Sequence, residues 1–152
     1  DYVYISTPYL VIDDEFIKAL TYASKRGVDV KILLPSIPDK KIPNYVAKSY
    51  YKTLISSGIK IYEYTPGFNH AKMFVSDDCV FSLGSINLDY RSFYLSYENA
   101  IFAYDTSVAV DIKKDLLKAF RKSKLIDEQE RKKIRRSILI TGYLFRFFAP
   151  LL

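Results

Sequence analysis

The sequence predicts an α/β domain in which helices flank a mixed β-sheet. Short apolar runs typical of buried strands alternate with longer segments of helical spacing, and two strand-like runs then follow each other across a short turn. Alternation of strands and helices favours parallel pairing, whereas a hairpin adds antiparallel pairing. Of the 152 residues, 49% are hydrophobic and 16% aromatic, which suffices for one buried core. The length suits one domain rather than two.

The first half of the chain contains three expected strands and two expected helices. Acidic side chains at 13–15 suit the start of a helix, and Gly27 suits its end. A second helix is indicated by Val46, Tyr50 and Leu54, which recur at helical spacing before Gly58. The expected strands are residues 2–7, 28–35 and 59–64, the expected helices are 13–26 and 44–57, and 36–43 is expected to be a loop.

The second half continues with a hairpin, a further strand and a helix. Residues 71–77 and 79–85 are expected to be strands, with Asp77 and Asp78 in the turn between them. Residues 98–104 (ENAIFAY) predict another strand. The amphipathic segment that follows, residues 106–123, predicts a helix with Thr106 as its cap.

Residues 126–152 form a tail of different composition. From Lys113 to the end, 12 Lys or Arg stand against 4 Asp or Glu, whereas residues 1–112 hold 11 against 13. The apolar run in the tail falls short of the ~20 residues of a membrane-spanning helix and is interrupted by Arg146. Two interpretations stay open, a basic and aromatic helix lying in a membrane interface and a helix docked on the domain.

His70, the single histidine, lies in the stretch FNHAKMFVSDD. If residues 70–76 form a strand, His70 and Lys72 share one face, while Asp77 belongs to the other. Ser85 and Asn87 are also two residues apart, and Gly84 permits a close backbone approach. An imidazole, an ammonium, a hydroxyl and an amide suit an anionic tetrahedral centre such as a phosphodiester.

No cluster of His, Cys and carboxylates has the spacing of metal ligands, so neither a metal nor a cofactor is called for. A lone structural histidine remains the alternative until a longer pattern is considered. That pattern is His70-x-Lys72-x4-Asp77-x6-Gly84-Ser85-x-Asn87, which matches the HKD signature of the phospholipase D superfamily.

Over roughly residues 2–125 the chain resembles the second half of bacterial cardiolipin synthases. The resemblance is carried by YISTPYLVIDDEFIKAL, ASKRGVDVKILLP, GIKIYEYTPGFNHAK and GSINLDYRSFYLSYENAIFAYD. The sequence departs from that family at Ser96, where Asn is expected, and at Asn69, where Leu is more usual. The resemblance implies a phospholipase D-like layered α/β domain at 1–125, followed by the basic tail at 126–152.

The resemblance also implies a chemistry that needs two histidines. In this family one HKD histidine attacks phosphorus to form a phosphatidyl-histidine, and the histidine of the other motif protonates the leaving alcohol and then activates the acceptor. One imidazole bonded to phosphorus cannot also carry that proton. Which of the two histidines is the nucleophile stays open.

The family roles are carried over onto matching residues of this chain. Lys72 and Asn87 map onto phosphate-binding residues, with Ser85 in support, and Glu98 maps onto the carboxylate that orients an HKD histidine. Asp77 is implied to be structural, as is Gly84. Tyr9, in TPY, and Arg91, in DYRSF, are candidates for the pocket, and Arg91 is alternatively a partner of Asp89 or another carboxylate.

The chain opens at Asp1 within an apparent strand, so we expect the natural protein to have an N-terminal half with a second HKD motif. The leading interpretation is a cardiolipin synthase at the bacterial cell membrane, with phosphatidylglycerol and an anionic bilayer as partners. Alternatives are a homodimeric HKD phosphodiesterase or nuclease, and an inactive membrane-docking half-domain. The balance of −2 over residues 1–112 counts against nucleic acid as a partner.

Overall fold

Seven strands form one mixed sheet in the computed structural model, which describes all 152 residues. Their order across the sheet is β8-β6-β5-β1-β3-β4-β9. The strands are β1 (Tyr2–Ser6), β3 (Asp29–Pro35), β4 (Lys60–Tyr64), β5 (Met73–Ser76), β6 (Val80–Gly84), β8 (Ala100–Tyr104) and β9 (Ser123–Ile126). β1, β3 and β4 run parallel, and the remaining pairs are antiparallel. The predicted mixed sheet is therefore confirmed.

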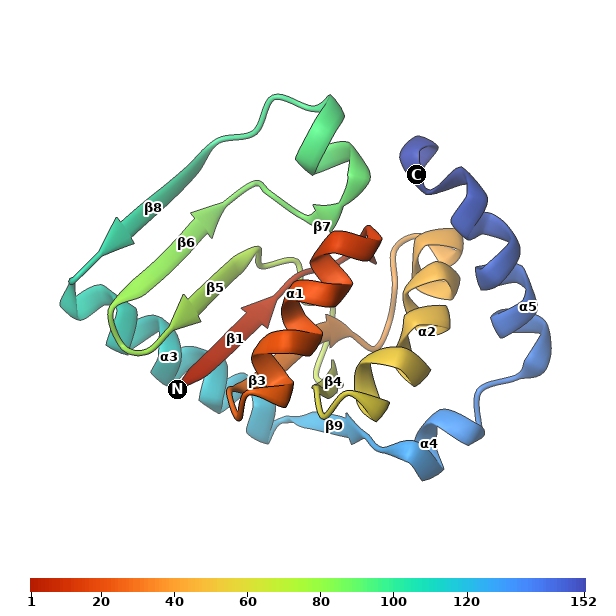
Figure 1. Cartoon of the computed structure of the whole chain (residues 1–152), viewed down its shortest axis with the longest axis horizontal. Coiled ribbons are helices and arrows are strands. Elements are labelled where there is room, and N and C mark those ends of the chain that lie inside the picture. Colours follow the sequence, from red (N-terminus) through yellow and green to blue (C-terminus); the bar gives the residue numbers. More distant parts are fainter.

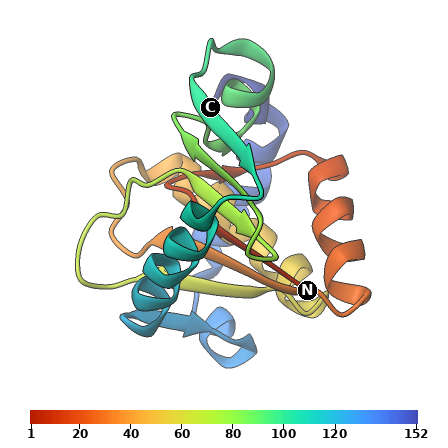
Figure 2. The ribbon, with the colours of Figure 1, turned by 90° about the vertical axis from the view of Figure 1, so that its left-hand side faces the viewer.

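Helices cover both faces of the sheet. On one face lie α1 (Asp14–Lys25) and α2 (Lys41–Ser56), and on the other lies α3 (Ser107–Arg121) (Figure 1). Figure 2 shows α1 and α3 on opposite sides of the strands. Two buried clusters match these layers, one of 18 residues under α1 and α2 and one of 9 residues under α3.

Smaller elements lie around the sheet. A two-stranded parallel ladder joins β2 (Leu10–Val11) to β7 (Leu88–Asp89), and a π-helical turn, Arg91–Leu95, follows β7. The tail contains α4 (Glu128–Lys132), α5 (Arg136–Phe145) and a 3₁₀ helix, Arg146–Leu151.

The α1 face of β5, β6 and β8 has no helix over it, as Figure 1 shows. Phe74, Ser82 and Phe102 are cross-strand neighbours on this face, and Tyr104 follows Phe102 on the same side of β8. We call these four side chains the open strip. Phe102 is 69% exposed and Tyr104 is 70% exposed. An apolar cavity of about 440 Å³ lies between the strip and α1.

Several expected boundaries were wrong. Helix α2 begins at Lys41, inside the segment expected to be a loop, because Pro43 occupies its first turn, where no N–H is needed. Strand β5 begins only at Met73, because β1 pairs with it no further than Ser6. Thr106 does occupy the N-cap of α3, but its side chain makes no capping bond and its Oγ1 is buried without a partner.

The tail docks on the domain through α5, which packs along α2 (Figure 1). Gly142 faces the backbone of Tyr45, and the guanidinium of Arg146 lies 3.8 Å from the centre of the Tyr50 ring. Ala149 is 3% exposed and belongs to the larger cluster. No helix in the structure has the length and apolar content needed to cross a bilayer.

The α2–α5 contact depends on the absence of a side chain at Gly142. A Cβ there would meet the Tyr45 carbonyl oxygen at 2.1 Å, so the helices would have to separate. Overpacking costs about 1–3 kcal/mol, sometimes more, whereas alanine regains only about 1 kcal/mol of helix propensity. We expect Gly142→Ala to lower the free energy of unfolding by about 2 kcal/mol, measured by urea denaturation. Gly67→Ala is the matched control, because nothing lies within 4 Å of a Cβ there. Equal stability of the two variants would contradict this packing.

Candidate active site

His70 and Lys72 lie in contact just before β5. The Nζ of Lys72 is 3.0 Å from Nδ1 and 3.2 Å from Nε2 of His70, and it donates to the His70 carbonyl oxygen at 2.9 Å. Phe68 and Tyr9 flank the imidazole, with ring centres 5.3 and 6.5 Å away. The predicted convergence of His70 and Lys72 is present, although both residues precede the strand. His70 itself is exposed, as an attacking or protonating group must be.

Asn69 fixes the loop that carries this pair. Its Nδ2 donates to Ser6 Oγ at 2.8 Å, and its Oδ1 accepts from the Ala71 N–H at 3.3 Å. These bonds tie the loop to the last residue of β1. Because a leucine could make neither bond, the position at which the sequence departs from the family pattern has its own role here.

Lys72 is partly buried, and negative charges lie near its ammonium. Burial lowers the pKa of its ammonium, and the negative charges of Glu98, Asp39 and Asp89 oppose that shift. The ammonium forms no ion pair, but the three carboxylates are near enough to influence its pKa. Such a cation can donate a hydrogen bond to a phosphoryl oxygen, which then becomes its nearest counter-charge.

Ser85 and Glu98 are held together at the ends of β6 and β8. Ser85 Oγ donates to a carboxylate oxygen of Glu98 and accepts from the Asn99 N–H at 2.9 Å. The Ser85 N–H donates to the Asn99 carbonyl, also at 2.9 Å. Gly84 makes this approach possible, since a Cβ there would lie 2.3 Å from the Asn99 carbonyl oxygen. The glycine of the motif is therefore required by close backbone contact.

Asn87 is positioned by a residue that sequence reasoning missed. Its backbone N–H donates to Ser92 Oγ at 3.1 Å, and its Nδ2 lies 3.4 Å from the same oxygen. Ser92 is in turn bonded through its N–H to Asp89, at 2.7 Å. The Oδ1 of Asn87 is buried and has no hydrogen-bond partner. This oxygen is a hydrogen-bond acceptor and would need a donor, so the atom of the amide that can bond a phosphate oxygen is Nδ2.

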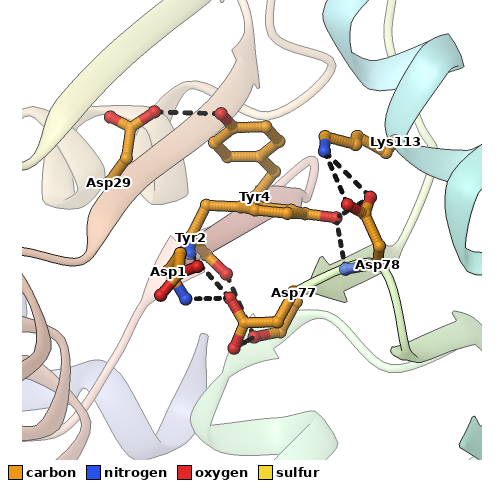
Figure 3. A network of polar contacts seen from close by, with 8 residues as sticks. Asp1, Tyr2, Tyr4, Asp29, Asp77, Asp78 and Lys113 are labelled. Atoms are coloured by element: carbon orange, nitrogen blue, oxygen red, sulfur yellow. Dashed lines mark hydrogen bonds and ion pairs between the residues drawn. The ribbon is translucent and has the colours of Figure 1, made fainter.

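Asp77 follows β5, at the end of the strand far from His70. Asp77 and Asp78 form the hairpin turn, with φ angles of 53° and 59°. Figure 3 shows the resulting network: Asp77 accepts from the Tyr2 N–H at 2.7 Å, and Asp78 pairs with Lys113 at 2.8 Å. These contacts join the hairpin to β1 and α3.

Tyr9 and Arg91 line one cavity of about 440 Å³ beside His70. Its lining residues are Tyr9, Val11, Lys40, Pro43, Asn87, Asp89, Arg91, Ser92, Ser96, Glu98, Leu151 and Leu152. Burial and a hydrogen bond to Asp39 raise the pKa of the Tyr9 hydroxyl. Arg91 does not pair with Asp89, the partner considered from the sequence, because the Asp89 carboxylate accepts from Ser92 inside the π-helical turn. No group of three or more His, Cys, Asp or Glu could hold a metal ion.

The chain matches one family of known proteins over most of its length. Residues 1–123 match the family model described as cardiolipin synthase, PLD-like domain. The chain belongs to this family. It is 37% identical to a cardiolipin synthase of Geobacillus kaustophilus and 38% identical to cardiolipin synthase 2 of Bacillus cereus. Both alignments cover 99% of this chain. It spans only about 30% of the length of these relatives.

Solved structures place the PLD-like domain in the same fold. Nuc of Salmonella typhimurium, a phospholipase D family member, superposes with a TM-score of 0.71 at 21% identity, covering 84% of this chain and 82% of Nuc. Phosphatidylserine synthase of Haemophilus influenzae also gives 0.71, at 17% identity, over all of this chain and 42% of the synthase. At these identities the likeness concerns the fold.

The position of Lys72 predicts a measurable titration. Since burial lowers the pKa of its ammonium, Lys72 should lose its proton below pH 10.5, the ordinary lysine value. Glu98→Gln should lower this pKa further, because it removes a negative charge that favours the ammonium. Both values can be read from NMR titration of ¹³Cε-labelled lysines. A Lys72 midpoint at or above 10.5, or an upward shift in Glu98→Gln, would contradict the described environment.

Proposed function

We propose that the protein containing this chain is a cardiolipin synthase, which joins two phosphatidylglycerol molecules into cardiolipin and releases glycerol. The observation that carries this is the Lys72 ammonium held against the His70 imidazole, inside a domain of the cardiolipin synthase family. Asn87 and Glu98 supply an amide and a carboxylate to the adjoining cavity, and the Ser85 hydroxyl is bonded to that carboxylate. These groups suit a phosphodiester and the proton transfers that its exchange requires.

The reaction balances over two displacements. In the first, an imidazole nitrogen attacks phosphorus, an N–P bond forms, and the P–O bond to the glycerol headgroup breaks. The leaving oxygen takes a proton from the second imidazole. In the second, the terminal hydroxyl of another phosphatidylglycerol returns a proton to that imidazole and attacks phosphorus, breaking the N–P bond. His70 is one of the two imidazoles, and Lys72 stabilises charge on the non-bridging oxygens.

The second imidazole comes, in this proposal, from another HKD half. The open strip supports a place for it, because Phe102 and Tyr104 leave most of their aromatic surface uncovered. Exposed aromatic patches of this kind mark interaction surfaces. The Gly84 N–H donates to the Lys72 carbonyl, which continues the pairing of β5 back to Lys72. Phe74 and Lys72 therefore share a face, and a half seated on the strip would approach from the side of Lys72.

Work at a bilayer is supported by the outward face of the tail. While α5 packs on α2, apolar side chains of the tail remain exposed, with values from 44% for Tyr143 to 85% for Phe147. They are Ile140, Tyr143, Leu144, Phe147 and Phe148. Arg135 and Arg136 lie exposed at the start of the same helix. Basic residues beside exposed aromatic and aliphatic groups suit the interface of an anionic membrane.

The central test is His70→Ala in the full-length protein with phosphatidylglycerol vesicles. Removal of one of two required imidazoles should lower formation of cardiolipin and glycerol by roughly 10³-fold or more. Mass spectrometry of the lipids and an enzymatic glycerol assay measure the two products. Lys114→Ala, an exposed change on α3, is the control and should retain wild-type rates.

The same preparation separates the alternatives. A protein that hydrolyses bis(p-nitrophenyl) phosphate or nucleic acid but transfers no phosphatidyl group would be a phosphodiesterase. Vesicle binding without turnover of any of these substrates would leave only a docking role. Either result would rule out the synthase.

Docking of the second half can be tested on the open strip. Phe102→Glu places a charge in the proposed interface, and cardiolipin formation should fall more than tenfold while circular dichroism stays unchanged. Tyr22→Glu, at a similarly exposed aromatic on α1, is the matched control and should have little effect. Wild-type activity of Phe102→Glu, or an equal loss in both variants, would show that the open strip is not part of the interface.

A further inference from the structure

Two cationic side chains of the cavity beside His70 have no acidic partner. Lys40 and Arg91 both line it, and neither takes part in any ion pair of the structure. The Lys40 ammonium lies 5.6 Å from the centre of the Tyr9 ring. Both residues are exposed enough to be mobile and hydrated, so each can move onto an anion that enters.

The acidic groups of the same region are already engaged. The Glu98 carboxylate accepts from Ser85, and the buried Asp89 accepts from the Ser92 N–H. Asp39, just outside the lining, accepts from the Tyr9 hydroxyl and from the Lys40 N–H. Hydrogen bonds thus hold the carboxylates in place, whereas the ammonium of Lys40 and the guanidinium of Arg91 remain available.

The start of α2 supplies partial positive charge beside Lys40. Lys40 is the N-cap of this 16-residue helix and makes no side-chain capping bond, and no acidic residue occupies the first turn. Lys40 and Pro43 both line the cavity, so this end of the helix faces it. The N-terminal end of a helix carries partial positive charge and favours an anion.

The cavity is close to the reacting phosphate. Tyr9 neighbours both groups, since its ring centre is 5.6 Å from the Lys40 ammonium and 6.5 Å from the centre of the His70 ring. In the proposed product, a single glycerol bridge separates the two phosphates. A site for the phosphate of the acceptor must therefore lie beside the phosphate that is transferred.

We propose that Lys40 and Arg91 form a second anion subsite, which binds the phosphodiester of the acceptor phosphatidylglycerol and directs its terminal hydroxyl toward the phosphorylated imidazole. This assignment rests on the proposed function. Lys72 and Asn87 hold the phosphate being transferred, and the Lys40–Arg91 subsite selects an acceptor that carries a phosphate over water or a neutral alcohol. Leu151 and Leu152 supply the apolar wall on the side of the acceptor lipid.

The test compares two acceptors in one reaction with the full-length protein. Micelles of phosphatidylglycerol are supplied with ethanol, so that cardiolipin reports transfer to an anionic acceptor and phosphatidylethanol reports transfer to a neutral one. In Lys40→Gln and Arg91→Gln, the ratio of cardiolipin to phosphatidylethanol should fall about tenfold each, the loss expected for one charge-assisted contact. Lys18→Gln and Arg121→Gln remove exposed charges outside the cavity and should leave the ratio unchanged.

Each other outcome contradicts the subsite. An unchanged ratio in Lys40→Gln and Arg91→Gln would show that the two cations do not select the acceptor. A parallel loss of both products would place them at the transferred phosphate or in general positioning. Wild-type protein that makes phosphatidylethanol but no cardiolipin would overturn the proposed function itself, a result visible before any variant is compared.

Discussion

The antiparallel pairing of β5 with β1 determines where the chemical groups of this domain meet. β1 runs parallel to β3 on one side and antiparallel to β5 on the other. Because Ser6 pairs with Met73, the chain before β5 emerges beside the end of β1, where Thr7 and Tyr9 also lie. His70 therefore lies beside Tyr9, which lines the cavity, and Lys72 lies against His70. If β5 ran parallel to β1, His70 and Lys72 would lie at the opposite end of the strands.

Much of the fold was predictable because its cues are local. Buried strands are recognisable as apolar runs. The glycines that follow the amphipathic segments predicted the ends of α1 and α2. The contact of His70 with Lys72 followed from two-residue spacing, which extended chain preserves even outside a strand. Contacts between distant segments left no such cue. Ser92 beneath Asn87 and Lys40 beside Tyr9 depend on how loops meet in space, and nothing near either residue in the sequence signals it.

The two ends of the HKD motif serve different physical purposes. At one end of β5, His70 and Lys72 are exposed or half-buried and have few fixed partners. At the other end, Asp77 and Asp78 adopt left-handed backbone conformations and are bonded to β1 and α3. Fixed contacts are thus concentrated at the turn, whereas His70 and Lys72 keep hydrogen-bonding capacity for the phosphate that we propose they bind.

The 3₁₀ helix Arg146–Leu151 contacts two environments at once. Leu151 and Leu152 line the cavity beside His70, while Phe147 and Phe148 of the same segment point outward and are exposed. With the outward groups in a bilayer, a lipid could move along this segment into the cavity without passing through bulk water. The proposed synthase would then obey surface-dilution kinetics: diluting its proposed substrate, phosphatidylglycerol, with an inert lipid would slow the reaction, whereas changing the volume of water around the same vesicles would not.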